Sequence, residues 1–380
     1  MALFYELAVL GAPTDDQVGD LEQFISDALE PFGMKLGHEV SWLVKPLRFC
    51  PKQKKAAAAV FFGGKGVKIT DLDHLIKQSI PVLPVVSDSA MVRDEIPESL
   101  RFLNCLVYND GGTQRVATAL LECVGLLPRQ RRVFLSYRRD EARHAALQLF
   151  DELSSRIFDV FLDTHGIAPA EDFQAMLWHR LCDSDVLVML DTPNYFESRW
   201  TSAEFGRALA KGISVLRIGW PSASPSARTA TASRVDLLDE EVDQDTGQLA
   251  KGAIKRICSQ LEAVRSQSYA IRNLNLVSNL RNAIEMIGGN VTGVGMHKAV
   301  YIQLADGKNV VVYPTVGVPT STTLHDATNN SPNCSSAVIF DPVGLHPGWI
   351  EHLDWLGSQI RSTHWVKATE VAWQFADWGD

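Results

Sequence analysis

The chain has 380 residues, of which 46% are hydrophobic and 21% charged, a composition typical of a globular protein large enough for two or three domains. Its formal net charge of −9 is spread along the sequence, so no basic domain of the kind that binds nucleic acid stands out. The six cysteines form no CxxC pair and no Cys/His cluster. Reduced thiols are therefore expected rather than a zinc site or a disulfide framework, and no metal is expected.

The first residues, MALFYELAVLGAPTDD, lack the charged start and long apolar core of a signal peptide. No apolar run reaches the roughly eighteen residues that a membrane-spanning helix needs. We therefore expect a cytoplasmic protein that has neither a membrane nor a nucleic acid as its partner.

Residues 1–128 alternate short apolar runs with amphipathic stretches, as in AAAAVFFGG followed by TDLDHLIKQS. Strands and helices that take turns along a chain predict a parallel sheet with helices packed on its faces. Pro128 ends the last helix of this N-terminal α/β domain, and a short basic segment, LPRQRR, leads into the next strand.

Residues 129–221 repeat this alternation and form the predicted central domain. The pattern predicts strands at 132–137, 158–163, 185–191 and 213–219, and helices near 141–156, 171–182 and 200–211. Residues 222–250 are rich in Ser, Thr, Ala and Asp without an apolar period, and we expect a surface loop there.

Residues 251–290 carry apolar side chains mostly three and four positions apart, which predicts an amphipathic helical connector. The pattern fits one long helix or two helices with a break near Ser268. Residues 291–380 return to alternation and predict a C-terminal α/β domain. The expected architecture is thus a central α/β domain between two further small α/β, Rossmann-like domains.

The most informative spacing lies in SRWTSAEF, where Trp200 and Glu204 are four residues apart on a predicted helix. Side chains at this spacing share one face of a helix. An indole beside a carboxylate can hold an aromatic leaving group and stabilise a cationic sugar. The alternatives are that Trp200 is a packing residue and that Glu204 is a solvated helix residue.

Three segments in order resemble Toll/interleukin-1 receptor (TIR) domains, particularly the members that cleave NAD+: FLSYRRDEA, VFLDTHGIAPAEDF and DSDVLVMLDTPNYFESRW. They are similar to the opening box of the family, to its second strand with the BB loop, and to the third strand with the entry to the glutamate helix. The resemblance implies a flavodoxin-like parallel sheet with helices on both faces. It also implies that NAD+ is a substrate and that no cofactor is needed.

The resemblance implies that Glu204 is the catalytic glutamate and that Trp200 covers the ribose or the nicotinamide. It further implies NAD-binding positions in the first strand and its loop, in the second strand, and after the BB loop; these are Tyr137, Arg138, Arg139, Asp163 and Phe173. Arginines at the carboxyl end of a strand suit a pyrophosphate, because a guanidinium makes bidentate bonds to phosphate oxygens. For either arginine the alternative is a bond to Asp140 or to a neighbouring subunit. For Asp163 it is a turn or cap, and for Phe173 the core.

The BB loop of the family corresponds to residues within 164–172, namely His165, Gly166, Ile167, Ala168 and Pro169. Gly166 and Pro169 give such a loop two discrete shapes, and in catalytic relatives it moves when subunits assemble. Ala170 stands where several relatives have glycine, and Thr201 stands where plant relatives usually have cysteine. Neither departure removes a catalytic group.

Four other patterns carry weaker indications. Gly63-Gly64-Lys65-Gly66 follows a predicted strand and could approach a phosphate, but its spacing fits neither GxGxxG nor GxxxxGKS, and a plain turn is favoured. His325-Asp326 with Ser321 lacks the elbow motif of a serine hydrolase. The arginines of LPRQRR are typical of a short linker between domains, where such side chains are solvated or paired with acidic neighbours. The C-terminal tryptophans fit a core or an interface: Trp349, Trp355, Trp365, Trp373 and Trp378.

These patterns lead to the expectation of an NAD+ nucleosidase that releases nicotinamide and yields ADP-ribose or a cyclic isomer. The resemblance to bacterial TIR effectors implies antiphage immunity, with activation by homo-oligomerisation through the TIR and flanking domains. A small molecule or a protein would be the trigger. The alternatives are a non-catalytic signalling or scaffold protein, and a nucleotide-sensing module in which an outer domain recognises a small signal molecule.

Overall fold

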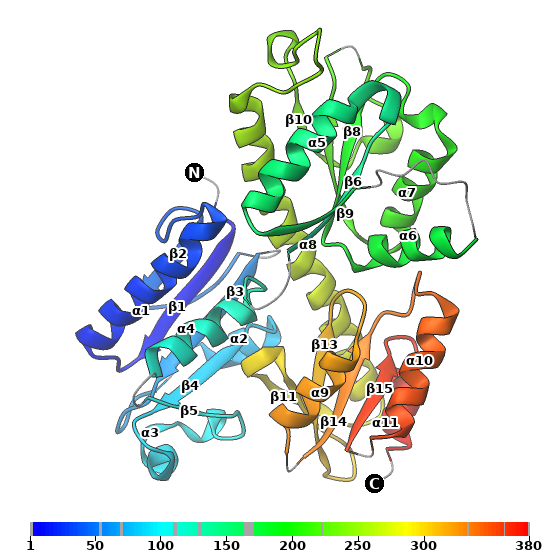
Figure 1. The fold of residues 1–380 in the computed structure, drawn as a ribbon. Helices are drawn as coiled ribbons and strands as arrows, with labels where there is room; N and C mark the ends of the chain where they lie inside the picture. The colour runs from blue at the N-terminus through cyan, green and yellow to red at the C-terminus, as the bar shows by residue number, and fades with distance from the viewer. Residues whose placement is uncertain are drawn as a thin grey trace. The chain divides into compact units, whose positions relative to one another are not determined.

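The computed structural model describes residues 3–52, 55–68, 71–108, 112–127, 131–162, 171–221, 223–332, 334–360 and 362–378, with side chains left out for residues 171–175. Three five-stranded sheets follow one another along the chain, coloured from blue through green to red in Figure 1. By their contacts the residues group into two compact units. One unit holds residues 1–129, 269–342 and 350–380, and the other, the central unit, holds residues 130–268 and 343–349.

The N-terminal sheet is entirely parallel, in the order β2-β1-β3-β4-β5. Its central strand β3 is buried along its whole length, as a strand covered on both faces must be. The strands are β1 (Tyr5–Gly11), β2 (Val40–Val44), β3 (Ala56–Phe62), β4 (Val82–Val86) and β5 (Leu106–Val107), and the helices are α1 (Asp15–Leu29), α2 (Leu72–Lys77), α3 (Val92–Glu95) and α4 (Gly112–Cys123).

The central sheet is also entirely parallel, in the order β10-β9-β8-β6-β7. Numbered from its own first strand this order is 2-1-3-4-5, the flavodoxin-like order, and the N-terminal sheet has the same one. The strands are β6 (Arg131–Ser136), β7 (Phe158–Leu162), β8 (Val186–Asp191), β9 (Ser214–Gly219) and β10 (Ser233–Asp236), and the helices are α5 (Arg139–Ser155), α6 (Glu171–Asp183) and α7 (Arg199–Ala210). The fold class predicted from sequence is confirmed here.

The fifth strand of the central sheet was not expected, because residues 222–250 were predicted to be a loop. β10 lies in this segment and pairs with β9 from Leu216 to Gly219. It is an edge strand of four residues with one buried apolar side chain, Val235, so it shows no apolar alternation that sequence analysis could detect.

The predicted helical connector is one continuous helix, α8 (Lys251–Met286), without a break near Ser268. Its two halves belong to different cores. Ile254, Ile257, Leu261 and Val264 pack in the core of the central unit, whereas Val277, Leu280 and Ile284 pack under the C-terminal sheet. The boundary between the two compact units falls inside this helix, between residues 268 and 269.

A chain of buried charges fixes the first half of α8 at the amino edge of the central sheet. Glu262 accepts a hydrogen bond from Arg131 and is paired with Arg265 at 3.2 Å. Arg265 also pairs with Asp185 at 3.3 Å, and all four side chains are at most 5% exposed. Removing any one member would take a partner from at least one buried charge, so these pairs tie the helix to β6 and to the residue before β8.

The C-terminal sheet is mixed rather than wholly parallel, in the order β11-β12-β13-β14-β15. β11, β12 and β13 pair antiparallel, while β13, β14 and β15 pair parallel. This domain is therefore α/β as predicted, but two antiparallel strands set it apart from the other two. The strands are β11 (Asn290–Val294), β12 (Val300–Gln303), β13 (Asn309–Thr315), β14 (Ser335–Phe340) and β15 (Thr363–Lys367), and the helices are α9 (Ser321–Asn330), α10 (Pro347–Ser358) and α11 (Val371–Ala376).

All six cysteines are free, and three of them, Cys123, Cys182 and Cys258, are buried. Within the described residues, no group of three or more His, Cys, Asp or Glu side chains is placed to hold a metal ion. Across the same residues, none of the helices is long and apolar enough to cross a membrane.

Candidate functional site

The carboxyl ends of β6 and β8 and the start of α7 meet at one edge of the central sheet. β6 ends at Ser136, β8 ends at Asp191, and a single turn of 3-10 helix, Tyr195–Glu197, leads into α7. Ser198 caps α7, since its hydroxyl accepts hydrogen bonds from the amides of Trp200 and Thr201. Open parallel sheets bind their ligands at this carboxyl edge.

Glu204 lies in a buried polar trio at this edge. Its carboxylate accepts a hydrogen bond from the hydroxyl of Ser136, and the same hydroxyl lies 2.6 Å from the phenol oxygen of Tyr195. Only 7% of Glu204 is exposed, and Ser136 and Tyr195 are almost fully buried. Glu204 is therefore not a solvated helix residue but a carboxylate held in place by a fixed donor.

Tyr195 is kept neutral by its surroundings. Burial raises the pKa of its phenol well above 10, and the nearby Glu204 carboxylate raises it further, although the hydrogen bond with Ser136 opposes the shift. Because the Ser136 hydroxyl donates to Glu204, the neutral phenol of Tyr195 donates to the Ser136 oxygen, without adding a second negative charge beside Glu204.

Thr201 holds the start of α7 against the turn that precedes it. Its hydroxyl donates to the carbonyl of Tyr195 and lies 3.2 Å from the carbonyl of Ser198. The hydroxyl of Ser202 donates to the carbonyl of Phe196 at 3.0 Å. These bonds fix the first turn of α7 and with it the direction of the glutamate one turn later.

Trp200 is 40% exposed, so packing in the core does not account for its presence. The guanidinium of Arg199 lies 4.5 Å from the centre of its ring, a cation–π distance. An exposed indole one helical turn before Glu204 offers a flat apolar surface on the same helix.

Arg138 is engaged with acceptors of the protein. Its guanidinium donates to the carbonyl of Asn194 at 2.8 Å, pairs with Glu197 at 3.2 Å and lies 3.6 Å from Glu141. Partial burial alone would raise the pKa of Glu141, but the nearby Thr192 hydroxyl, hydrogen bonds from Asn194 and the charge of Arg138 together lower it. Arg138 is thus paired within the protein, but with Glu141 and Glu197 rather than with the expected Asp140.

The other predicted binding residues are placed as follows. Tyr137 is 8% exposed and lies in the main core of the central unit, while Arg139 begins α5 and is half-buried. Phe173 lies in α6, but its side chain is outside the described part of the chain. Asp163 and the BB-loop residues His165, Gly166, Ile167, Ala168 and Pro169 are also outside the described residues.

Sequence reasoning missed the two hydroxyls that hold Glu204. Ser136 and Tyr195 lie within the quoted segments FLSYRRDEA and DTPNYFESRW, yet nothing in either segment marks them as partners. It also missed Asp191, the last residue of β8, whose carboxylate pairs with the buried Arg217. Only the pairing of β6 with β8 and of β8 with β9 brings these residues to one edge.

A family comparison identifies the central unit. The model of the TIR domain matches residues 133–250. Residues 133–250 form a TIR domain. The predicted family is therefore confirmed, and the matched range includes β10 and the segment 222–250 that sequence analysis had assigned to a loop.

No curated protein matches the chain. Among solved structures, it is similar to tagatose-6-phosphate ketose/aldose isomerase from Escherichia coli, with 12% identity, 72% of this chain and 83% of that chain covered, and a TM-score of 0.22. It is also similar to a leucine-binding protein from Thermotoga maritima, with 12% identity, 82% and 97% covered, and a TM-score of 0.19. TM-scores this low support no conclusion about fold or function.

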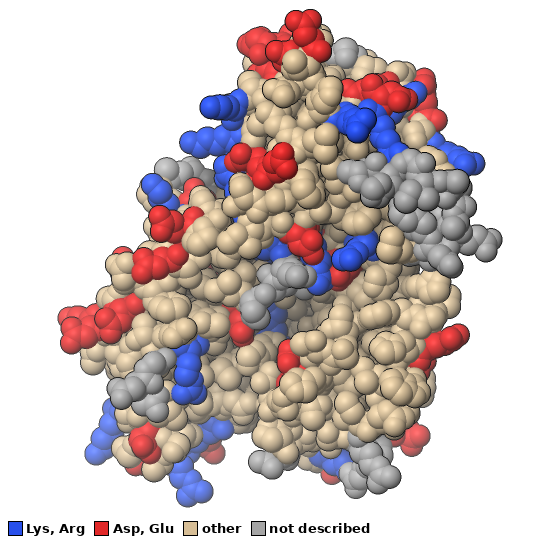
Figure 2. Space-filling view, viewed as in Figure 1, with Lys and Arg blue, Asp and Glu red and all other residues tan. Residues whose placement is uncertain are grey.

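The remaining sequence patterns fall outside the TIR domain or lack a site. His325 is exposed beside Asp326 on α9, and no hydrogen bond joins it to Ser321 in the described structure. Of the basic joint LPRQRR, Arg131 is buried against Glu262, and Arg132 pairs with Asp183 at 2.6 Å. On the face drawn in Figure 2, Lys and Arg side chains lie among Asp and Glu rather than in one patch.

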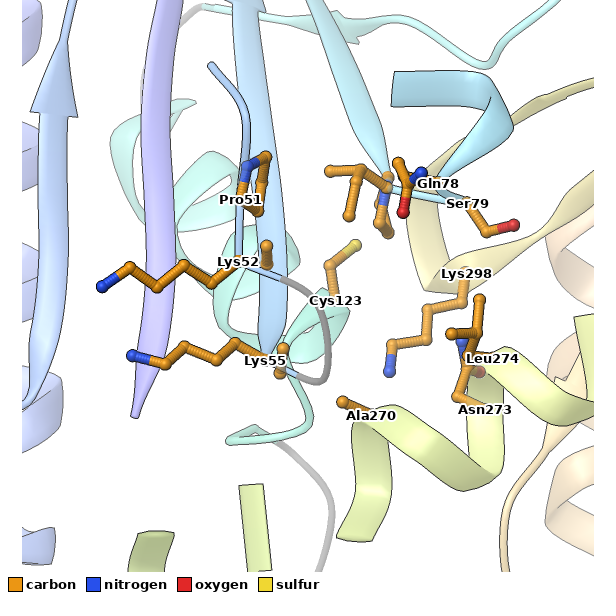
Figure 3. A pocket seen from close by; sticks show the side chains of 14 residues that line it. Pro51, Lys52, Lys55, Gln78, Ser79, Cys123, Ala270, Asn273, Leu274 and Lys298 are labelled. Atoms are coloured by element: carbon orange, nitrogen blue, oxygen red, sulfur yellow. The ribbon is translucent and has the colours of Figure 1, made fainter. Parts of the chain in front are cut away.

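A cavity of about 240 Å³ lies at the amino edge of the N-terminal sheet, beside the start of β3. In Figure 3 the side chain of Lys298 extends into this space, whereas those of Lys52 and Lys55 point away from it. The ammonium of Lys298 lies 3.7 Å from the centre of the Tyr269 ring. Burial raises the pKa of the neighbouring Cys123 to about 12, although Lys298 opposes the shift, so this thiol is not a ready nucleophile.

Proposed function

We propose that the TIR domain of this protein is an NAD+ nucleosidase with Glu204 as its catalytic carboxylate. The observation that carries the proposal is the placement of Glu204 at the carboxyl edge of the parallel sheet, held by Ser136 and one helical turn after an exposed tryptophan. NAD+ is the substrate, so the reaction needs no cofactor.

The chemistry requires one carboxylate. When the bond between ribose C1′ and the nicotinamide nitrogen breaks, its electron pair goes to the cationic ring, which leaves as neutral nicotinamide. Positive charge then develops on C1′ and the ring oxygen of the ribose, and a nearby carboxylate stabilises it. Water attacks C1′ and loses a proton to give ADP-ribose; attack by a nitrogen of the adenine ring gives a cyclic isomer. Because the leaving group is already cationic, no general acid is needed.

Trp200 supplies the apolar surface for the leaving group. Its ring is exposed and is backed by Arg199, and it shares a helical face with Glu204. Stacking on such a ring orients a flat aromatic group without requiring further hydrogen bonds. The tryptophan would thus position nicotinamide while the carboxylate faces the ribose.

In this structure the carboxylate of Glu204 is covered by neighbouring residues. Glu204 is 7% exposed and its carboxylate is occupied by the Ser136 hydroxyl, so NAD+ requires a local rearrangement to reach it. This supports activation by self-assembly, in which contacts between copies of the chain stabilise an open site. A small molecule or a protein would supply the trigger, and a bacterial antiphage effector in the cytoplasm is the setting in which such restraint is useful.

The test is product analysis by mass spectrometry. Full-length protein is incubated with NAD+ over a range of protein concentrations, and its mass in solution is measured in parallel by light scattering. The proposal predicts nicotinamide together with ADP-ribose or its cyclic isomer, at a rate per chain that rises as the protein assembles.

A second candidate is a scaffold in which the TIR domain provides only surfaces for self-association. The burial of Glu204 and the ion pairs of Arg138 with Glu141 and Glu197 favour it, because the carboxylate and the guanidinium would then serve to stabilise the fold rather than to bind NAD+. It predicts assemblies that leave NAD+ intact at every protein concentration, so the same experiment separates the two functions.

A further inference from the structure

A second cavity of about 610 Å³ lies in the N-terminal domain, at the carboxyl edge of its sheet. Its lining comes from the segments that follow β1, β3, β4 and β5, represented by Ala12, Gly63, Ser87 and Tyr108. The strand order β2-β1-β3-β4-β5 reverses direction between β1 and β3. Such a switch point is where open parallel sheets bind ligands, and this volume lies in the range of ligand pockets.

The loop after β3 offers backbone donors to this cavity. The amides of Gly63 and Gly64 are already used, donating to Val85 at 2.8 Å and to Glu95 at 3.0 Å. Among the described residues, the amides of Lys65 and Gly66 donate to no acceptor. Gly66 has a φ of +77°, which few residues other than glycine adopt. Adjacent unused amides at a turn of this kind can bind an anion, and Lys65, the first of the two residues, lines the cavity, whereas Gly66 lies next to the lining.

Side-chain charges at the cavity are of both signs. Lys65 and Arg93 are exposed, and in the described part of the chain neither makes an ion pair. Asp94 and Glu95 also line the cavity, and the carboxylate of Glu95 accepts hydrogen bonds from the Ser87 amide at 2.9 Å and from the Ser87 hydroxyl. A bare dianion would be repelled by these carboxylates. A ligand that combines an anionic group with hydroxyl donors satisfies both sets of side chains.

An aromatic wall completes the cavity. The ring of Tyr108 packs edge-on against Phe62, with 5.7 Å between centroids, and its hydroxyl lies 2.6 Å from that of Thr113. Met91, also in the lining, is 38% exposed. A fixed phenol ring and an exposed thioether form an apolar surface against which a planar heterocycle can stack.

The N-terminus of α1, which also borders the cavity, is a poor place for an anion. Thr14 and Gln17 close a capping box, so the amides of both residues are already satisfied. Asp15 and Asp16 add negative charge to the first turn. An anionic group is therefore directed to the loop at Lys65 rather than to the helix.

We propose that this cavity binds a nucleotide, with its phosphate at Lys65 and Arg93, its ribose hydroxyls at Asp94 and Glu95, and its base against Tyr108. The cavity described above at the amino edge of the same sheet is smaller, and its lysine is already held by the ring of Tyr269. The proposal does not depend on catalysis by Glu204, because every residue it uses lies in the N-terminal domain.

The test is isothermal titration calorimetry on the full-length protein. The probes are the adenosine, guanosine, cytidine and uridine monophosphates, with ribose 5-phosphate and inorganic phosphate as partial ligands. The proposal predicts that at least one nucleotide binds, and that it binds more tightly than either partial ligand. Lys65→Glu and Arg93→Glu are each expected to weaken binding about tenfold or more, since each replaces a favourable phosphate contact by a repulsive charge.

Two controls locate the ligand. Lys35→Glu changes an exposed lysine of the same domain outside the cavity and is expected to leave binding unchanged. Trp200→Ala reports binding in the TIR domain instead. The proposal is overturned if no nucleotide binds, if ribose 5-phosphate or phosphate binds as tightly as the nucleotide, or if Trp200→Ala weakens binding while the Lys65 and Arg93 variants do not.

Discussion

The hydroxyl of Ser136, at the end of β6, donates a hydrogen bond to the carboxylate of Glu204 on α7. The two residues are 68 positions apart in the chain, and both are buried. The bond places the candidate catalytic carboxylate at the sheet edge and covers it at the same time. The same hydrogen bond therefore both positions the Glu204 carboxylate and keeps it from solvent.

Ser136→Ala is expected to destabilise the central unit by about 1–3 kcal/mol, because it leaves a buried carboxylate short of a donor. Scanning calorimetry of the full-length protein measures this as a lower melting temperature for the transition of that unit. Ser155→Ala is the matched control, since the Ser155 hydroxyl bonds a carbonyl on the exposed end of α5. Equal shifts in both variants would mean that the Ser136 hydroxyl does not hold Glu204.

Trp200→Ala is expected to raise the KM for NAD+ about three- to tenfold while leaving the melting temperature nearly unchanged. The reason is that an exposed ring contributes little to the core, whereas loss of a stacking surface costs about 0.5–1.5 kcal/mol of binding. Trp355→Ala, which changes a tryptophan that is 60% exposed in the C-terminal domain, serves as the control. An unchanged KM would remove Trp200 from the site.

Much of the central domain could be predicted from sequence because its strands and helices alternate. The predicted strand at 132–137 is shifted from β6 by one residue at each end, and the one at 185–191 starts one residue before β8. The spacing of Trp200 and Glu204 likewise placed both on α7. These are local properties of the chain. Both the spacing of its apolar residues and its resemblance to TIR domains indicate them.

What lay beyond prediction depends on packing between distant segments. α8 was expected as a helix, but its sequence does not show that its two halves enter different cores on either side of Ser268. The partnership of Ser136 with Glu204 and Tyr195 depends on which strands pair. The sequence pattern singled out Glu204 as a candidate, whereas its burial, which decides how accessible the carboxylate is, required the three-dimensional structure.

Arg265→Met is expected to destabilise the central unit by about 3–5 kcal/mol, because Asp185 and Glu262 would keep buried charges without this partner. Arg234→Met removes an arginine from an exposed pair with Asp236 at 3.6 Å and is expected to cost less than about 1 kcal/mol. Denaturation by urea compares the two variants. Similar midpoints would show that the buried chain of charges does not hold α8.

The pair of Arg256 and Glu241 gives a pH dependence. Hydrogen bonds from Arg256, together with one from the amide of Leu238, lower the pKa of Glu241 from 4.5 to about 2. A carboxyl whose pKa is lower in the folded state stabilises the protein above its unfolded pKa, and this stabilisation is lost as the pH falls through the folded value.

Arg256→Gln is therefore expected to be less stable than the wild type at pH 7, with a difference that shrinks as the pH falls from about 4.5 toward 2. Urea denaturation at a series of pH values, over the range in which both proteins stay folded, gives the difference directly. A difference that stays constant with pH would show that the Glu241 charge is not what Arg256 stabilises.

The catalytic role of the Glu204 carboxylate is tested directly by the rate of nicotinamide release from NAD+ by assembled full-length protein. Glu204→Gln keeps the size of the side chain and removes the charge, and is expected to lower the rate by about a hundredfold or more. Glu240→Gln, at an exposed glutamate of the same unit, is the matched control and should release nicotinamide at the wild-type rate. Release by Glu204→Gln at the wild-type rate, or no release by the assembled wild type, would contradict the assignment.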